Sequence, residues 1–164
     1  MTTGAFDMTR HMISLVFMAL LLCSCHENKD EFTMQCIKCF SETGASFNKD
    51  VEACLVIPGG GCPGCIASGM AFVIQNKDYF SKEQAKFEVV FTRVGSMKLL
   101  KRALGSLSAD DLNCRVDWQD KFLLDTQENE YPLVLYLKNG EIQKAESQKP
   151  DSNALNNLYN VIRQ

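Results

Sequence analysis

Histidine is nearly absent from this sequence. Only two of the 164 residues are histidines, His11 and His26, and both lie near the N-terminus. Ser-His-Asp triads and Cys-His nucleophile pairs need an imidazole as general base, so the rest of the chain can build neither. A zinc site with histidine ligands is excluded there for the same reason. Any reactive chemistry in the folded part must come from other side chains.

The chain also lacks a strong excess of either positive or negative charge. The chain has 17 Lys and Arg against 20 Asp and Glu, which gives a formal net charge of −3. Nucleic acids and anionic membrane surfaces attract strongly basic chains, and this balance favours neither of them. We therefore expect no nucleic acid partner.

Long hydrophobic runs are scarce too. One mainly apolar run, MISLVFMALLL over residues 12–22, follows Arg10 and His11. It is too short to span a bilayer as a lone helix, but it has the length of the apolar region of a signal peptide. We therefore expect the protein to be exported, whichever of the early methionines starts translation.

The residues that follow, Leu22-Cys23-Ser24-Cys25, resemble the lipobox of bacterial lipoproteins. In that motif a small residue precedes the modified cysteine and an aliphatic residue stands three positions before it. Cys25 fits this pattern, whereas Cys23 has Leu22 directly before it. The resemblance implies a lipid on Cys25 and a place in the cell envelope, on the periplasmic face of the inner or outer membrane or at the cell surface. The alternative is an ordinary cleaved secretory signal with two incidental cysteines.

Cleavage before Cys25 predicts three parts: a signal peptide over residues 1–24, a lipidated cysteine with a polar tether over 25–33, and one domain over 34–164. The domain is long enough to bury a single core. Six of the eight cysteines fall in it, namely Cys36, Cys39, Cys54, Cys62, Cys65 and Cys114. Thiols in an oxidising compartment pair, act catalytically or bind metal, so these residues point to the function.

Two of the cysteines lie where a strand should end and a helix begin. Residues 51–57 form a short apolar run typical of a buried strand, and a glycine run over 59–61 stops it. Pro63 suits the first turn of a helix, because its missing N–H is harmless there. The pair Cys62 and Cys65 therefore sits at a strand-to-helix junction.

The other expected elements alternate between strand and helix before a hairpin. They are strands over 86–94, 114–116, 132–137 and 141–144, helices over 96–104 and from Ser108, a turn at Asn139-Gly140, and a last helix capped by Asp151. This order predicts an α/β fold with a mixed central sheet and helices on both faces.

Cysteines at these positions can exchange disulfides. The positive end of a helix dipole and its unpaired N–H groups stabilise a thiolate, which lowers a cysteine pKa from about 8.5 toward roughly 3.5 to 7.5. Cys62 comes first and is predicted to be the nucleophile. Cys65 lies deeper in the turn and is predicted to resolve the mixed disulfide.

Cys62-Pro63-Gly64-Cys65 after a strand, with Tyr131-Pro132 opening the later hairpin, resembles the thioredoxin fold. Pro132 follows Cys62 by 70 positions, which is similar to the membrane-tethered, TlpA-like thiol-disulfide oxidoreductases. The resemblance implies an enzyme that acts on exported protein thiols or disulfides, with a membrane redox partner and without cofactor or metal. It implies a cis Pro132 facing the dithiol and a Tyr131 backbone that pairs with substrate. Gly61 departs from the family, which usually has Trp there.

Two other interpretations stay open. Cys36 and Cys39 precede the dithiol with the spacing C-x2-C-x22-C-x2-C, close to that of a four-cysteine zinc site. A strand over residues 34–40 argues against it, since residues three apart on a strand point to opposite faces. The other interpretation is a non-catalytic binding module with structural cysteines.

Three further residues have structural expectations only. Cys54 is expected to be a small buried side chain within a strand. Glu52, the nearest carboxylate in sequence to serve as a proton acceptor, is expected at a solvated edge. Trp118 is expected to anchor a surface loop to the core.

Overall fold

Five strands form one mixed sheet in the order β3-β2-β1-β4-β5. The strands are β1 Ala53–Pro58, β2 Phe87–Thr92, β3 Cys114–Asp117, β4 Leu133–Lys138 and β5 Glu141–Ser147. The three strands β1, β2 and β3 run parallel, while β4 is antiparallel to both β1 and β5. This computed structural model describes residues 29–84, 86–105, 107 and 110–164. The expected signal peptide, Cys25 and the start of the expected helix at Ser108 lie outside the described residues.

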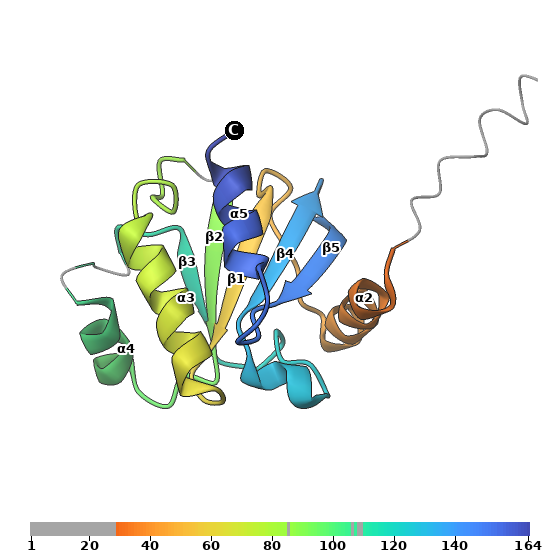
Figure 1. The fold of residues 1–164 in the computed structure, drawn as a ribbon, viewed down its shortest axis with the longest axis horizontal. Helices are drawn as coiled ribbons and strands as arrows, with labels where there is room; N and C mark the ends of the chain where they lie inside the picture. The colour runs from red at the N-terminus through yellow and green to blue at the C-terminus, as the bar shows by residue number, and fades with distance from the viewer. Residues whose placement is uncertain (1–28, 85, 106, 108–109) are drawn as a thin grey trace, which may run out of the picture.

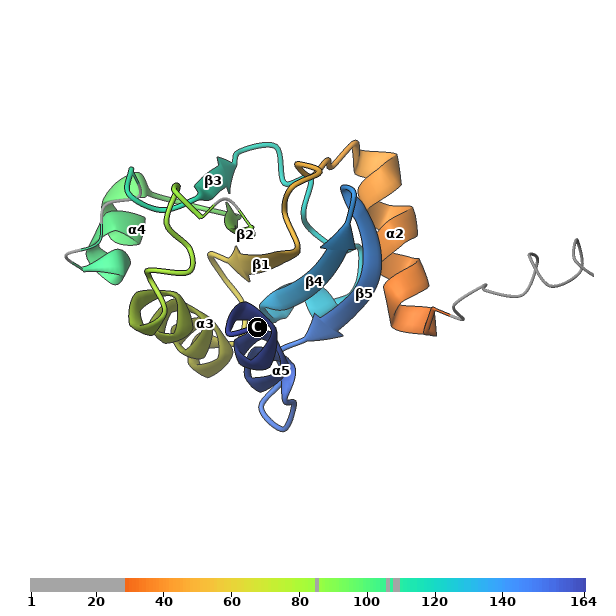
Figure 2. The same ribbon diagram turned by 90° about the horizontal axis from the view of Figure 1, so that it is seen from above.

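Helices cover both faces of the sheet (Figures 1 and 2). The helices are α2 Glu31–Thr43, α3 Pro63–Gln75, α4 Met97–Leu104 and α5 Ala154–Ile162, and a short 3-10 helix η1 spans Gln127–Glu130. Helix α2 lies on one face along β5, and α3 and α5 lie on the other. The predicted α/β class, with the mixed central sheet of a thioredoxin-like arrangement, is confirmed. None of the described helices has the length and apolarity needed to cross a membrane.

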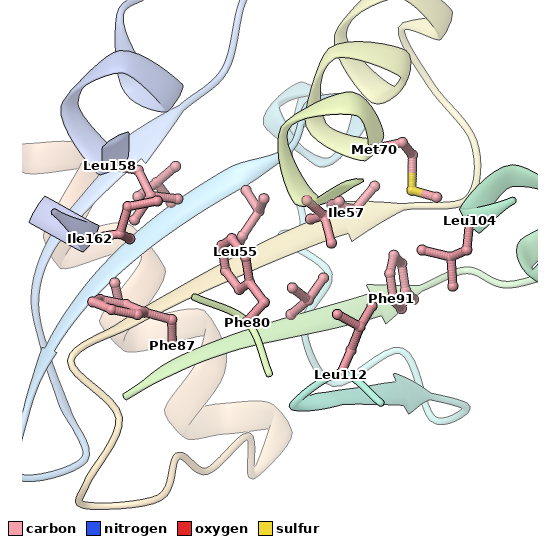
Figure 3. Packing of buried hydrophobic residues seen from close by; sticks show 14 of the residues in the cluster. Leu55, Ile57, Met70, Phe80, Phe87, Phe91, Leu104, Leu112, Leu158 and Ile162 are labelled. Atoms are coloured by element: carbon pink, nitrogen blue, oxygen red, sulfur yellow. The ribbon is translucent and has the colours of Figure 1, made fainter. Parts of the chain in front are cut away.

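The sheet separates two hydrophobic clusters. Along β1, Leu55 and Ile57 face α3 and α5, whereas Cys54 and Val56 face α2. Figure 3 shows the first cluster, in which side chains of β1 and β2 meet those of three helices. All six residues of β1 are buried because this strand is central and covered on both faces, which explains its continuous apolar run.

Helix α2 replaces the strand expected over residues 34–40, so that expectation is wrong. Asp30 caps the helix by accepting a 2.9 Å hydrogen bond from the amide of Thr33, and Gly44 ends it with a left-handed φ of 70°. Thr33, Cys36 and Phe40 are its buried residues, and their spacing of three and four is helical rather than alternating. The helix takes in residues 31–33 of the expected tether.

The last helix also begins later than expected. Asn153, not Asp151, occupies the N-cap position of α5, and its side chain makes no capping hydrogen bond. The expectation that Asp151 caps this helix is therefore wrong. Ala154, Leu158 and Ile162 are the buried residues of α5, whereas Tyr159 is exposed.

Candidate functional site

The glycine run after β1 passes through a narrow gap between two backbone segments. The amide of Gly59 donates to the carbonyl of Thr92 at 2.7 Å, and a Cβ on Gly59 would overlap the carbonyl of Arg93. Gly61 has a φ of 135°, and a Cβ there would lie 2.6 Å from the Cα of Glu130. Glycine is thus required at both positions by close backbone approach, and at Gly61 by its φ as well.

Cys62 and Cys65 form a disulfide at the start of α3, with their Cα atoms 5.4 Å apart. Cys62 is the N-cap residue and Pro63 is the first residue of the helix. The amide of Cys65 donates to the Cys62 sulfur at 3.3 Å. Cys62 is half-buried, whereas Cys65 is only 5% exposed. The structure brings the two predicted residues together at the predicted junction, and their roles in exchange stay a prediction.

This position favours a thiolate on Cys62 once the disulfide is reduced. The first turn of α3 contains no acidic residue, so no carboxylate there opposes the helix dipole. The amide of Cys65 already points at the Cys62 sulfur and would stabilise negative charge on it.

A hydrogen bond joins the dithiol to the segment that carries Tyr131 and Pro132. The amide of Cys62 donates to the carbonyl of Glu130 at 2.9 Å, and Tyr131 continues from η1 in an extended conformation. Pro132 is buried, and a Cβ on Gly69 of α3 would lie 3.3 Å from its Cγ. Pro132 therefore packs against α3 at Gly69, four positions after Cys65, and its place facing the dithiol stays a prediction.

The prediction of a cis peptide bond at Pro132 is wrong, because no described peptide bond is cis. The amide of Tyr131 donates to the carbonyl of Glu128 at 3.2 Å, which closes η1 and delivers the chain into β4 without a cis bond. The Tyr131 N–H is therefore already engaged within η1.

The other cysteines do not join the dithiol. Burial raises the pKa of Cys36 to about 12, and it also raises the pKa of the fully buried Cys54 and of the half-buried Cys114. Cys39 donates from its thiol to the carbonyl of Leu123 at 3.2 Å. The expectation for Cys54 is confirmed, since it lies within β1 in the cluster beneath α2.

The alternative four-cysteine site is not assembled in the structure. Cys36 and Cys39 do share one side of α2, but α2 covers the sheet face opposite to α3, which carries Cys65. Over the described ranges, no three His, Cys, Asp or Glu side chains lie close enough together to hold a metal ion.

The structure agrees with the expectation for Glu52 and contradicts the one for Trp118. Glu52 pairs with Lys86 at 2.8 Å with both side chains more than half exposed, and it precedes β1, whereas Cys62 follows the other end of that strand. The expected solvated role of Glu52 is confirmed. Trp118 is 65% exposed, so the expectation that it anchors the loop in the core is wrong.

A polar cluster beside the glycine run escaped the sequence analysis. The buried hydroxyl of Thr92 donates to Asp117 at 3.1 Å, and Asp117 also accepts from the amide of Phe122 at 2.8 Å. Asp120 accepts from the amide of Arg93 at 3.1 Å. These hydrogen bonds position the end of β2, where the carbonyl of Thr92 accepts from the amide of Gly59. Its only sequence signal was the pair of aspartates on either side of an exposed loop.

Comparisons of the chain with profiles of known protein families, with curated proteins and with solved structures give no match. The class that the fold and the site define is an α/β protein of thioredoxin-like arrangement with a cysteine pair at the N-terminus of a helix.

Proposed function

We propose that this protein is a thiol-disulfide oxidoreductase that acts on exported proteins through Cys62 and Cys65. The observation that carries the proposal is the unequal exposure of the two sulfur-bearing residues at the first turn of α3. Cys62 is accessible to a partner and Cys65 is buried behind it. A nucleophilic thiol must be accessible to the substrate, whereas the resolving thiol has to reach only the nucleophile's sulfur.

The exchange balances without a cofactor. The Cys62 thiolate attacks a substrate disulfide, forms a mixed disulfide and releases the first substrate thiolate. The Cys65 thiolate then attacks the Cys62 sulfur, which releases the second substrate thiolate and forms the Cys62–Cys65 disulfide. Two electrons pass from the protein to the substrate, and the same steps in reverse oxidise a substrate dithiol.

Tyr131 and Pro132 are proposed to bind the substrate segment. The carbonyl of Tyr131 supplies an acceptor for an amide of an extended peptide, and the buried Pro132 supports the segment from behind. Because the Tyr131 amide is used within η1, the substrate backbone would be held by one hydrogen bond at this residue rather than by two.

The proposed location follows from the N-terminal sequence. A lipid on Cys25 would hold the domain in the cell envelope, where exported proteins are its substrates and a membrane redox partner resets the dithiol. This part of the proposal rests on the lipobox-like residues 22–25, outside the described part of the chain.

Replacing Cys62 tests the activity. Cys62→Ser should abolish insulin reduction and scrambled-ribonuclease turnover, because no nucleophile remains at the helix start. Cys39→Ser is the matched control: it removes a half-buried thiol on the other side of the sheet and should retain turnover. Undiminished turnover by Cys62→Ser, with the fold intact by circular dichroism, would refute the proposal.

The second candidate is a non-catalytic binding module. It is favoured by the trans bond before Pro132 and by the engaged amide of Tyr131, which together differ from the expected substrate-binding loop. Titration of the disulfide against glutathione buffers separates the two candidates. A reduction potential below about −300 mV indicates a structural bridge, and one between about −270 and −100 mV indicates a working redox pair.

A further inference from the structure

An apolar groove runs from the dithiol to the space between α3 and α4. It consists of two adjoining cavities of about 240 and about 580 Å³. Both are lined by Gly59, Ile66, Met70 and Ala103, so they form one depression, called here the α3/α4 groove. Figure 3 shows Met70 of α3 near Phe91 of β2, and both residues line the groove.

The groove begins at the nucleophile and ends at an exposed leucine. Gly61 and Pro63, the two neighbours of Cys62 in sequence, line its near part. Leu99 of α4 lines the far part and is 63% exposed. The helix rises about 10 Å from Pro63 to Met70 at 1.5 Å per residue, which about three residues of an extended peptide would span.

Helix α4 and the loop before it carry unpaired positive charge next to the groove. Arg93, Lys98, Lys101 and Arg102 are exposed, and no acidic residue occurs in the segment 93–105. Arg93 lies beside the groove, since its guanidinium would be 3.9 Å from a Cβ on Gly60. At helical spacing Arg102 adjoins Leu99, whereas Lys98 and Lys101 lie on the side of α4 away from the groove. None of the four side chains forms an ion pair with another described residue. Such a cluster stands out in a chain whose formal net charge is −3.

We infer that the α3/α4 groove binds an apolar side chain of the exchanging protein, located about three residues from its reactive cysteine and next to an acidic residue. This inference rests on the proposed function and adds the substrate class. The apolar lining excludes water from the bound side chain, and Arg93 and Arg102 at the edge of the groove attract the acidic neighbour before the disulfide exchange.

The groove favours a peptide over a membrane surface as its occupant. It is concave and continuous with the residues beside Cys62, so a segment lying in it presents its cysteine to the nucleophile. A flat anionic surface would meet the basic side chains of α4 without entering the groove.

Four disulfide-linked peptide dimers test the inference with the full-length protein in detergent. The peptides share one sequence around a single cysteine. They carry Leu or Asn three residues to either side of it, and Glu or Lys at the next position outward. The reduced protein is mixed with each dimer in a single turnover, and thiol release is followed by mass spectrometry after acid quenching. Each exchange converts one peptide disulfide to two thiols and leaves the Cys62–Cys65 disulfide.

The dimer with Leu and Glu should react about tenfold faster than the dimer with Asn and Lys, as partial burial of one leucine allows. Ala103→Glu puts a charge into the groove from an exposed helix position and should remove the preference for Leu; Leu99→Asn is a second variant with the same expectation. Arg93→Glu with Arg102→Glu should reverse the preference for Glu.

The control is Lys38→Glu with Lys138→Glu, which changes the net charge equally on other elements and should keep both preferences. Hydroxyethyl disulfide, which is neutral and too small to reach the groove, should be reduced equally by all variants. If it is reduced but the four peptides react at one rate, the inference fails and the proposed function stands. If no disulfide is reduced, the proposed function fails and the inference with it. Equal peptide rates with binding to phosphatidylglycerol vesicles, lost in a variant with Lys98→Glu and Lys101→Glu on the outer side of α4, would identify a membrane as the partner of α4 instead.

Discussion

The amide of Cys62 donates a 2.9 Å hydrogen bond to the carbonyl of Glu130, so the residue that begins α3 is held directly by the residue that ends η1. These residues are far apart in sequence, and this bond sets the dithiol against the Tyr131-Pro132 segment. The bond requires the backbones to approach closely, and Gly61 makes that approach sterically feasible. Any side chain larger than hydrogen at position 61 would meet the backbone of Glu130.

Adding a single methyl group at Gly61 should damage the site. Gly61→Ala forces a Cβ against the backbone of Glu130 at a φ of 135°, and we expect a loss of about 2 kcal/mol or more in the free energy of unfolding. Gly64→Ala is the matched control, because a Cβ there has no neighbour within 4 Å and Gly64 lies within α3. Chemical denaturation of both variants measures the difference, and equal stabilities would contradict this account of the glycine run.

The buried hydroxyl of Thr33, on the sheet face covered by α2, should contribute to the stability of the fold. Thr33 is 0% exposed, and its Oγ1 accepts a 2.9 Å hydrogen bond from the amide of Ala145 in the edge strand β5. Thr33→Val keeps the shape but leaves that amide without its partner, so we expect a loss of about 1 to 3 kcal/mol in the free energy of unfolding. Thr33→Ser retains the hydroxyl and should lose less. A valine variant as stable as wild type would show that the bond contributes nothing.

The sheet could be predicted from sequence because its signals are local. The central strand β1 is a continuous apolar run, and Asn139-Gly140 marks the hairpin between β4 and β5. Helix α2 was missed although Asp30 and Gly44 are good caps, since its buried positions include a threonine and a cysteine that do not read as an apolar stripe.

The site was predictable only in part. The cysteine pair is a contiguous motif, so its position at the start of a helix followed from neighbouring residues. Three other features depend on contacts between distant segments. They are the hydrogen bond from Cys62 to Glu130, the trans bond before Pro132 and the α3/α4 groove. No local pattern in the sequence encodes such contacts, and periodicity does not report the exposure of Trp118.

Asp30 should make the stability of α2 depend on pH. The backbone amide of Thr33 and then its hydroxyl donate to the Asp30 carboxylate, which lowers the pKa of that group below its ordinary value near 3.8. A lowered folded-state pKa stabilises the fold above the ordinary pKa, and the stabilisation is lost as pH falls through the lowered value. Asp30→Asn should therefore have a lower melting temperature than wild type at pH 7, and the gap should narrow as the pH falls below the ordinary value of 3.8.

Asp78→Asn is the control for that pH series, because Asp78 is exposed and lies in a turn far from α2 in sequence. Melting curves between pH 2.5 and 7 for the three proteins give the comparison. A gap between Asp30→Asn and wild type that stays constant over this range would show that the charge of Asp30 has no part in capping.

The tether to the proposed lipid is short. Asp30 caps α2, and Lys29 donates to the carbonyl of Ile142 at 2.6 Å, so the chain is fastened to β5 just before the helix. The five residues from Cys25 to Lys29 span at most about 18 Å. A lipid on Cys25 would therefore keep the domain close to its leaflet and restrict its substrates to proteins near that membrane.

Replacing Cys25, the proposed site of the lipid, tests this location. Cys25→Ser should move the protein from the membrane fraction to the soluble fraction, because a serine hydroxyl does not receive the lipid. Palmitate fed to growing cells should label the wild type and not this variant. Cys23→Ser is the matched control, since Cys23 would leave with the signal peptide, and it should remain labelled and membrane-bound. If the wild type takes no label while Cys25→Ser stays in the membrane fraction, the lipobox interpretation is wrong and an uncleaved signal peptide holds the chain.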